Sequence, residues 1–73
     1  MSASWALDVR RAGMISFVHI PLNARSETSA KASATRRLRA MRGVRDAYLS
    51  RLRADGEVIA QWFCNDGRWV ANL

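Results

Sequence analysis

A chain of 73 residues has room for one domain, residues 1–73, and buries only about 60–65% of its surface, enough for one helix packed on one sheet. One cysteine and one histidine exclude an intramolecular disulfide and a cysteine-rich zinc site, and no apolar run approaches the ~18–20 residues of a membrane span. The formal net charge of +6 points to an acidic or polyanionic partner, and nothing requires an oxidising compartment, so we expect a cytoplasmic protein without a membrane partner.

The first predicted elements form a β-hairpin. Residues 5–9 alternate between apolar and small or polar side chains, which predicts a half-buried strand with Trp5 facing the core. After a turn at residues 10–13, residues 14–20 are rich in β-branched and aromatic side chains and predict a second strand. Pro21 cannot donate a hydrogen bond to a ladder, so this strand either ends there or lies at the edge of the sheet.

One helix is predicted near residues 28–42, and either Ser26 or Thr28 can cap its start. Four apolar residues recur with spacings of four, four and three and share one helical face: Ala30, Ala34, Leu38 and Met41. The small side chains on that face allow the helix to lie close to a sheet. Gly43 suits the end of the helix, and the basic residues of this stretch fall mostly on its other faces.

Residues 44–53 fit either a continued helix or a third strand. We favour the strand, because Gly43 interrupts the helix and a hairpin signal follows. Asp55-Gly56 and Asp66-Gly67 are strong turn dipeptides flanked by strand-like sequence. They divide the rest of the chain into a third, a fourth and a fifth strand.

Charge and burial favour a definite register at both hairpins. At the first, a three-residue loop 54–56 sets Arg53 opposite Glu57 and gives the sheet one largely apolar face: Tyr48, Leu52, Val58, Ala60 and Trp62. At the second, a two-residue loop pairs Cys64 with Trp69 and keeps both on one face.

The predicted order β-β-α-β-β-β is an α+β fold, a five-stranded antiparallel sheet with one helix packed on one face. Nine residues form the predicted core: Trp5, Leu7, Leu38, Met41, Tyr48, Leu52, Val58, Trp62 and Trp69. The other face of such a sheet stays partly open. Aromatic residues there, with Phe17, Tyr48 and Phe63 as candidates, would make a hydrophobic contact patch, although the sequence does not determine which face the helix covers.

We expect no catalytic group, no metal site and no cofactor. The six carboxylates leave no pair free for acid–base chemistry, because most of them serve turns, the helix start or an ion pair. His19 lies in the middle of a strand, and Cys64, with no base located to activate it, is a small sheet residue. The three tryptophans could stack nucleobases, but a role in the core is favoured in so small a protein.

The positive charge is concentrated between Lys31 and Arg53, where eight basic residues stand against one acid, Asp46, so that this segment carries +7. The rest of the chain holds four basic residues and five acids and carries −1. Such clustering is typical of a polyanion binder or of a protein that docks on an acidic partner, with a solvated helix face as the alternative. Seven cations are therefore the candidate partner-binding residues: Lys31, Arg36, Arg37, Arg39, Arg42, Arg45 and Arg51.

A Ser/Ala-rich helix containing Ala30-Lys31 is followed by the Asp55-Gly56 turn and by the closing run Asp66-Gly67-Arg68-Trp69-Val70. This order of parts, with the length and basic character of the chain, resembles small phage anti-CRISPR proteins that inhibit type I-F CRISPR–Cas systems, over roughly residues 28–70. The resemblance implies a non-catalytic inhibitor, in the cytoplasm of an infected bacterium, that binds the Cas7-type backbone subunits of a crRNA-guided, Cascade-like surveillance complex and blocks target DNA binding. It also implies that non-specific DNA is drawn to the complex. Only Lys31 matches by position, whereas the neighbouring arginines match in character.

Two other functions stay open at this point. One is a small basic DNA- or RNA-binding accessory protein of a phage or mobile element. The other is an assembly module, a homodimer formed through an exposed strand edge. We expect a monomer or a weak dimer. Salt dependence separates direct DNA binding from protein binding, because each phosphate contact on duplex DNA gives a slope of ~−0.9 in log K against log salt.

Overall fold

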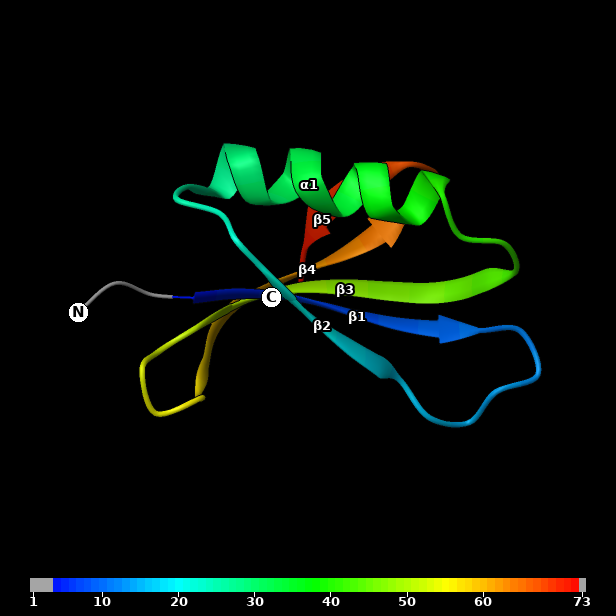
Figure 1. Ribbon diagram of the computed structural model, residues 1–73, viewed down its shortest axis with the longest axis horizontal. Coiled ribbons are helices and arrows are strands. Elements are labelled where there is room, and N and C mark those ends of the chain that lie inside the picture. The colour runs from blue at the N-terminus through cyan, green and yellow to red at the C-terminus, as the bar shows by residue number, and fades with distance from the viewer. Residues whose placement is uncertain (1–3, 73) are drawn as a thin grey trace.

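The computed structural model describes residues 4–72 (Figure 1). Its elements follow the predicted order: β1 (Ser4–Arg11), β2 (Val18–Leu22), α1 (Glu27–Arg39), β3 (Val44–Leu52), β4 (Val58–Asn65) and β5 (Arg68–Ala71). The strands form one five-stranded antiparallel sheet in the order β2-β1-β3-β4-β5, and α1 lies across one face of it. The predicted α+β fold is thereby confirmed. Within the described residues, no helix has the length and apolar character that a membrane crossing requires.

The first hairpin forms as predicted, but its bounds differ. β1 continues to Arg11, and the Met14 N–H donates to the Arg11 carbonyl oxygen at 3.0 Å, which closes a turn. Residues 14–17 are therefore part of the loop, and β2 begins only at Val18. Pro21 lies inside β2 and not beyond it. This position is compatible with proline because β2 is an edge strand.

The start of α1 is fixed by Ser26. Its Oγ accepts a hydrogen bond from the Ser29 N–H at 3.1 Å, and the Ser29 Oγ in turn accepts one from the Ser26 N–H at 3.2 Å. This reciprocal arrangement is a capping box, which satisfies two amide groups that the first helical turn leaves unpaired. Of the two caps that the sequence allows, Ser26 is the one used.

The helix ends at Arg39, three residues before the predicted end. The N–H groups of Ala40 and Met41 donate to carbonyl oxygens three residues earlier, at 3.2 and 3.1 Å, which tightens the last turn and stops the α-helical pattern. Gly43 is therefore not the residue that ends the helix. It lies in the turn before β3 with a φ of 71°, a conformation that glycine adopts without steric cost.

The core lies between α1 and the side of the sheet that α1 faces, here named the covered face; the opposite side is the open face. Ala30 and Ala34 of the predicted stripe are fully buried, and their small size lets α1 lie close to the sheet. Eight buried residues form one cluster: Trp5, Leu7, Val9, Leu22, Ala30, Ala34, Ala47 and Leu49. Four more predicted core residues are partly buried against it: Leu38, Met41, Trp62 and Trp69.

The loop between β3 and β4 follows the prediction. The Arg53 N–H donates to the Glu57 carbonyl oxygen at 2.8 Å across the loop 54–56, and the Arg53 and Glu57 side chains form an ion pair. The Gly56 N–H donates back to the Arg53 carbonyl oxygen at 2.9 Å, with a φ of 90° at Gly56. A three-residue hairpin loop requires such a left-handed residue, which explains the Asp-Gly sequence.

Beyond this loop the β3–β4 register contains an irregularity that the sequence did not reveal. Leu52 pairs with Val58, but the next pair joins Arg51 to Ala60, so that Ile59 is an extra residue in β4. This is a β-bulge, which reverses the alternation of side chains between the two faces.

The bulge explains why three predicted core residues lie elsewhere. Trp62 pairs with Leu49 and shares the covered face with it, whereas an unbulged register would pair Trp62 with Tyr48. Tyr48 therefore lies on the open face, Leu52 is only half-buried and Val58 is 50% exposed. The assignment of Tyr48, Leu52 and Val58 to the core is wrong, and the fully buried Leu49 is one of the core residues that the prediction missed.

The last hairpin has the predicted register. Cys64 pairs with Trp69 across the two-residue loop Asp66-Gly67. The φ values of 53° and 77° in this loop match the turn type that Asp-Gly favours. Cys64 and Trp69 thus lie on the covered face beside Trp62, as the sequence predicted.

Candidate interaction surface

The seven predicted partner-binding cations lie on three parts of the molecule. Lys31, Arg36, Arg37 and Arg39 belong to α1, Arg42 follows its C-terminal end, and β3 carries Arg45 and Arg51. All are exposed except Lys31, which is half-buried. Arg45 and Arg51 are six residues apart in one strand, or about 20 Å at ~3.3 Å per residue. The structure therefore groups five of the arginines near α1 and its C-terminal end, and it separates Arg51 from them.

Lys31 differs from the arginines because its charge is already engaged. Its Nζ donates to the Glu27 Oε2 at 2.8 Å, one helical turn earlier, and lies 5.2 Å from the centroid of the Trp62 ring. The lysine therefore covers part of the core and has an internal counterion. The sequence alone does not distinguish Lys31 from the arginines, because its contact with Trp62 depends on the fold.

The helix arginines, defined as Arg36, Arg37 and Arg39, have no such partner. None has a carboxylate of the described residues within ion-pair distance, and the same is true of Arg42 and Arg45. At 100° per residue, the positions of Arg36 and Arg39 lie on the side of α1 opposite the buried alanines. Their guanidinium groups are thus free to bind an external anion or carboxylate.

Asp46, the one acid inside the basic segment, does not neutralise these arginines. Its Oδ2 accepts a hydrogen bond from the Arg10 Nε at 2.8 Å, across the β1–β3 pairing. This pair lies on the open face, because Asp46 and Arg10 both alternate with covered residues of their strands. The basic surface near α1 therefore keeps its full positive charge.

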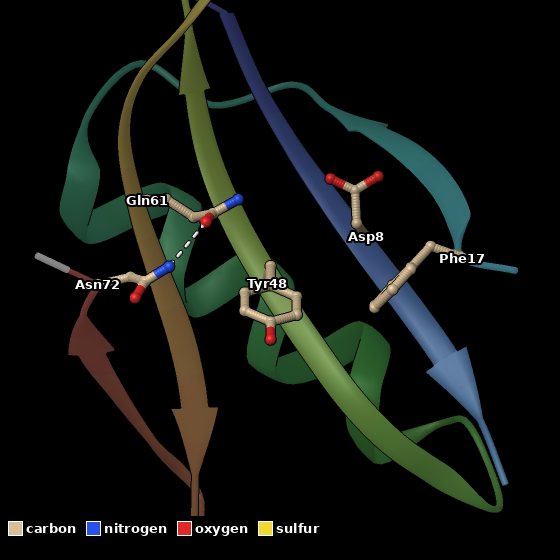
Figure 2. A pocket seen from close by; sticks show the side chains of 5 residues that line it. All are labelled: Asp8, Phe17, Tyr48, Gln61 and Asn72. Atoms are coloured by element: carbon tan, nitrogen blue, oxygen red, sulfur yellow. Dashed lines mark hydrogen bonds between the residues drawn. The ribbon is translucent and has the colours of Figure 1, made fainter. Parts of the chain in front are cut away.

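The open face of the sheet carries a shallow groove of about 480 Å³ (Figure 2). Five residues from different segments line it: Asp8, Phe17, Tyr48, Gln61 and Asn72. The Phe17 and Tyr48 rings meet edge to face, with centroids 5.7 Å apart. The Asn72 Nδ2 donates to the Gln61 Oε1 at 2.9 Å, and the Gln61 Nε2 donates to the Ser50 Oγ at 3.1 Å. These contacts hold the amide groups in place beside the two rings.

The carboxylate that lines this groove, Asp8, has a partner within the fold. The His19 Nδ1 forms a hydrogen bond with the Asp8 Oδ1 at 2.7 Å, from the neighbouring edge strand. Within the described part of the chain, no cluster of three or more His, Cys, Asp and Glu residues is arranged to hold a metal ion. The groove thus offers aromatic surface and amide groups, which suit contact with uncharged groups better than contact with phosphate.

The aromatic residues divide between the two faces. Trp5, Trp62 and Trp69 lie on the covered face, where the Trp5 and Trp62 rings are 5.5 Å apart and the Trp69 Nε1 donates to the Thr35 Oγ1 at 3.0 Å. Their predicted core role is confirmed. Tyr48 and its cross-strand neighbour Phe63 lie on the open face, so the contact patch that the sequence left undecided is on the side away from α1.

The chain matches no protein-family model, no curated protein and no solved structure. Two surfaces carry chemistry of different kinds: the exposed arginines near α1, which suit an anionic target, and the aromatic open face, which suits an uncharged one.

Proposed function

We propose that this protein is a non-catalytic, phage-encoded inhibitor that binds a type I crRNA-guided surveillance complex and prevents the complex from binding target DNA. The observation that carries the proposal is the group of exposed arginines near α1 that have no carboxylate partner among residues 4–72. Like charges so close together repel and lower the stability of a fold unless a partner neutralises them. The proposed partner is an acidic patch of a Cas7-type backbone subunit beside the DNA channel, as the sequence resemblance implies.

The helix dipole accounts for only part of this charge. Arg36, Arg37 and Arg39 lie in the last turn of α1, where a cation contributes about 0.3–1 kcal/mol at low salt. That effect fades within the last turn, and α1 ends at Arg39. Arg42 and Arg45 lie beyond it, so the fold gains little from their charge. A partner that uses all five arginines is the simpler explanation.

A second candidate function is direct binding of DNA or RNA. The observation that favours it is the choice of cation, since 11 of the 12 basic residues are arginine. The planar guanidinium group binds phosphate as well as carboxylate in a bidentate manner, so the same surface suits either target. The two functions differ in salt dependence and in their requirement for the protein complex.

The test is a charge reversal on the outer side of α1, Arg36→Glu with Arg39→Glu. The matched control is Arg25→Glu with Arg68→Glu, which changes the net charge equally at two exposed arginines outside the basic segment. Binding to a purified type I surveillance complex and to a random-sequence duplex is measured at two salt concentrations. We expect the helix variant to lose at least about 2 kcal/mol of binding to the complex, or roughly 30-fold, because complementary charge becomes repulsion. The control should lose less than about threefold, as expected for charges outside the contact.

The outcomes separate the two functions. Equal loss of complex binding by both double variants would mean that only net charge matters, which contradicts a defined contact. Unchanged binding by a folded helix variant would mean that the arginines form a solvated surface. If the protein binds duplex DNA but not the complex, and the helix variant loses that binding with a steep salt slope, direct nucleic-acid binding replaces inhibition as the function.

A further inference from the structure

The loop between β1 and β2, together with the first residue of β2, exposes four large apolar side chains within five positions. Ile15 is 90% exposed, Met14 and Val18 are each 58% exposed, and Phe17 is 42% exposed. None of the four belongs to the buried core cluster. Single exposed apolar residues are common in soluble proteins, but a contiguous group marks a surface that another molecule covers. These residues, 14–18, are named the apolar loop.

The apolar loop is held beside the turn that connects α1 to β3. The Ala12 N–H donates to the Gly43 carbonyl oxygen at 2.7 Å, which ties the two connections together. Arg11, at the end of β1, pairs with Val44 at the start of β3. Figure 1 shows both connections at the same end of the molecule, remote from the β3–β4 hairpin. Residues separated by some thirty positions in sequence thus form one surface.

Three arginines lie on the chain segments that meet at this end of the molecule, and they are named the flanking arginines: Arg11, Arg42 and Arg45. All three are exposed, and no carboxylate among residues 4–72 lies within ion-pair distance of them. The nearby acid, Asp46, is occupied by Arg10. The surface therefore combines uncompensated positive charge with aliphatic side chains that remain more than half exposed.

Phe17 anchors the loop to the sheet. Its ring lies under the Arg10 guanidinium, 5.2 Å from centroid to carbon, and against the Tyr48 ring. These contacts fix one end of the apolar loop, so the more exposed Met14 and Ile15 project from a supported base. A preorganised apolar side chain loses less conformational freedom on binding than one in a free loop.

We propose that the apolar loop and its three flanking arginines form a docking surface for an acidic protein with an apolar pocket, in which Ile15 is the central side chain. This inference rests on the proposed function and names the contact through which the inhibitor holds its protein partner. Methionine, aromatic residues and arginine are enriched at protein interfaces, and apolar anchors surrounded by polar contacts carry most of the binding energy. The most exposed side chains, Met14 and Ile15, neither stack on bases nor bind phosphate, and the Phe17 ring already packs against Tyr48 and Arg10, so a protein fits this surface better than a single-stranded nucleic acid does.

The test replaces the central side chain, Ile15→Ser, and compares it with Ile59→Ser. Ile59 is a suitable control because it is 45% exposed and lies in β4 next to the β3–β4 loop, at the opposite end of the sheet. Affinity is measured for three probes: a purified type I surveillance complex, a random-sequence duplex, and vesicles of phosphatidylglycerol and phosphatidylcholine. Ile15→Ser should lower affinity for the complex by at least about tenfold, as expected for an interface anchor. Ile59→Ser should change it by less than about threefold, because a residue outside the contact contributes little.

Each result bears on the proposal. If the wild-type protein does not bind the complex, the proposed function fails and the docking surface, which names that partner, fails with it. If the wild type binds and Ile15→Ser binds equally well, the docking surface is refuted while the proposed function stands. If Ile15→Ser instead loses affinity for the duplex or for the vesicles and keeps it for the complex, the loop is a DNA wedge or a membrane anchor, and the protein-docking assignment is overturned. Circular dichroism of both variants tests whether the fold is retained.

Discussion

Replacement of Leu49 by alanine tests the bulged register of β3 and β4. Leu49 is fully buried on the covered face, opposite Trp62. Removing its three outer carbon atoms forfeits about 0.8 kcal/mol of transfer free energy for each, or roughly 2.4 kcal/mol. A residual cavity on the order of 50 Å³ adds about 1 kcal/mol at ~24 cal/mol per Å³. We therefore expect Leu49→Ala to lower the free energy of unfolding by about 3–4 kcal/mol.

Val58→Ala is the matched comparison, because an unbulged register would place Val58 in the core with Trp62. In the structure Val58 is 50% exposed, so its loss should cost less than about 1 kcal/mol. The assay is urea denaturation followed by tryptophan fluorescence, at a temperature where the wild type is fully folded. A domain of this size has a total stability of about 4–11 kcal/mol, so the Leu49 variant should unfold at much lower urea.

Equal destabilisation by the two variants would contradict the bulged register. If Val58→Ala destabilises the protein as much as Leu49→Ala does, the covered face contains Val58 and the bulge at Ile59 is absent. The core assigned to the covered face would then be wrong, and Tyr48 would no longer belong to the open-face groove.

Three further predictions concern the helix and the reactive side chains. Ser26→Ala should lower the free energy of unfolding by about 1 kcal/mol because the capping box is lost, whereas Thr28→Ala should change it by less than about 0.5 kcal/mol. Equal effects of the two substitutions in thermal denaturation would contradict the observed cap. Lys31→Met should lower the free energy of unfolding by about 0.5–1.5 kcal/mol, because the ion pair and the cation–π contact are lost, and the loss should be larger at low than at high salt. An unchanged melting curve would show that these contacts contribute nothing. Cys64→Ala and His19→Gln should each retain binding in the assays above, and a folded variant of either that no longer binds would argue for a role in the site.

The parts of the fold that depend on local sequence were predictable. The Ser26 cap, the alanine face of α1 and the two Asp-Gly loops are each specified by residues within a few positions of one another. Such signals depend only on neighbouring residues, so they can be recognised from the sequence alone. They were sufficient for the order of elements and for the register of the last hairpin.

The bulge was not predictable, because it depends on packing between strands that are distant in sequence. Strand alternation alone allows two registers between β3 and β4, one with Trp62 beside Tyr48 and one with Trp62 beside Leu49. The second also brings Trp62 against Trp5 of β1, which is 57 positions away in sequence. Local charge at the Arg53–Glu57 pair is compatible with either register, so the outcome depends on packing between distant strands.

For the candidate site, the sequence located the arginines but not their surroundings. The pairing of Arg10 with Asp46, 36 positions apart, and the contact of Lys31 with Trp62 both depend on the fold. The sequence predicts a strand over residues 14–20, because β-branched and aromatic residues have the composition of one, whereas β2 begins at Val18 and residues 14–17 form a loop. The exposure of these side chains is apparent only from the structure.

The edge position of Pro21 has a consequence for the behaviour of the protein at high concentration. One edge of the sheet is β2, whose proline lacks an N–H, and the other edge is β5, which has only four residues. Neither edge presents a long, complete row of amide groups to an incoming chain, and such rows are what template fibril growth. The edges of this sheet are therefore poor templates for strand-by-strand polymerisation at high concentration, although α1 covers only one side of the sheet.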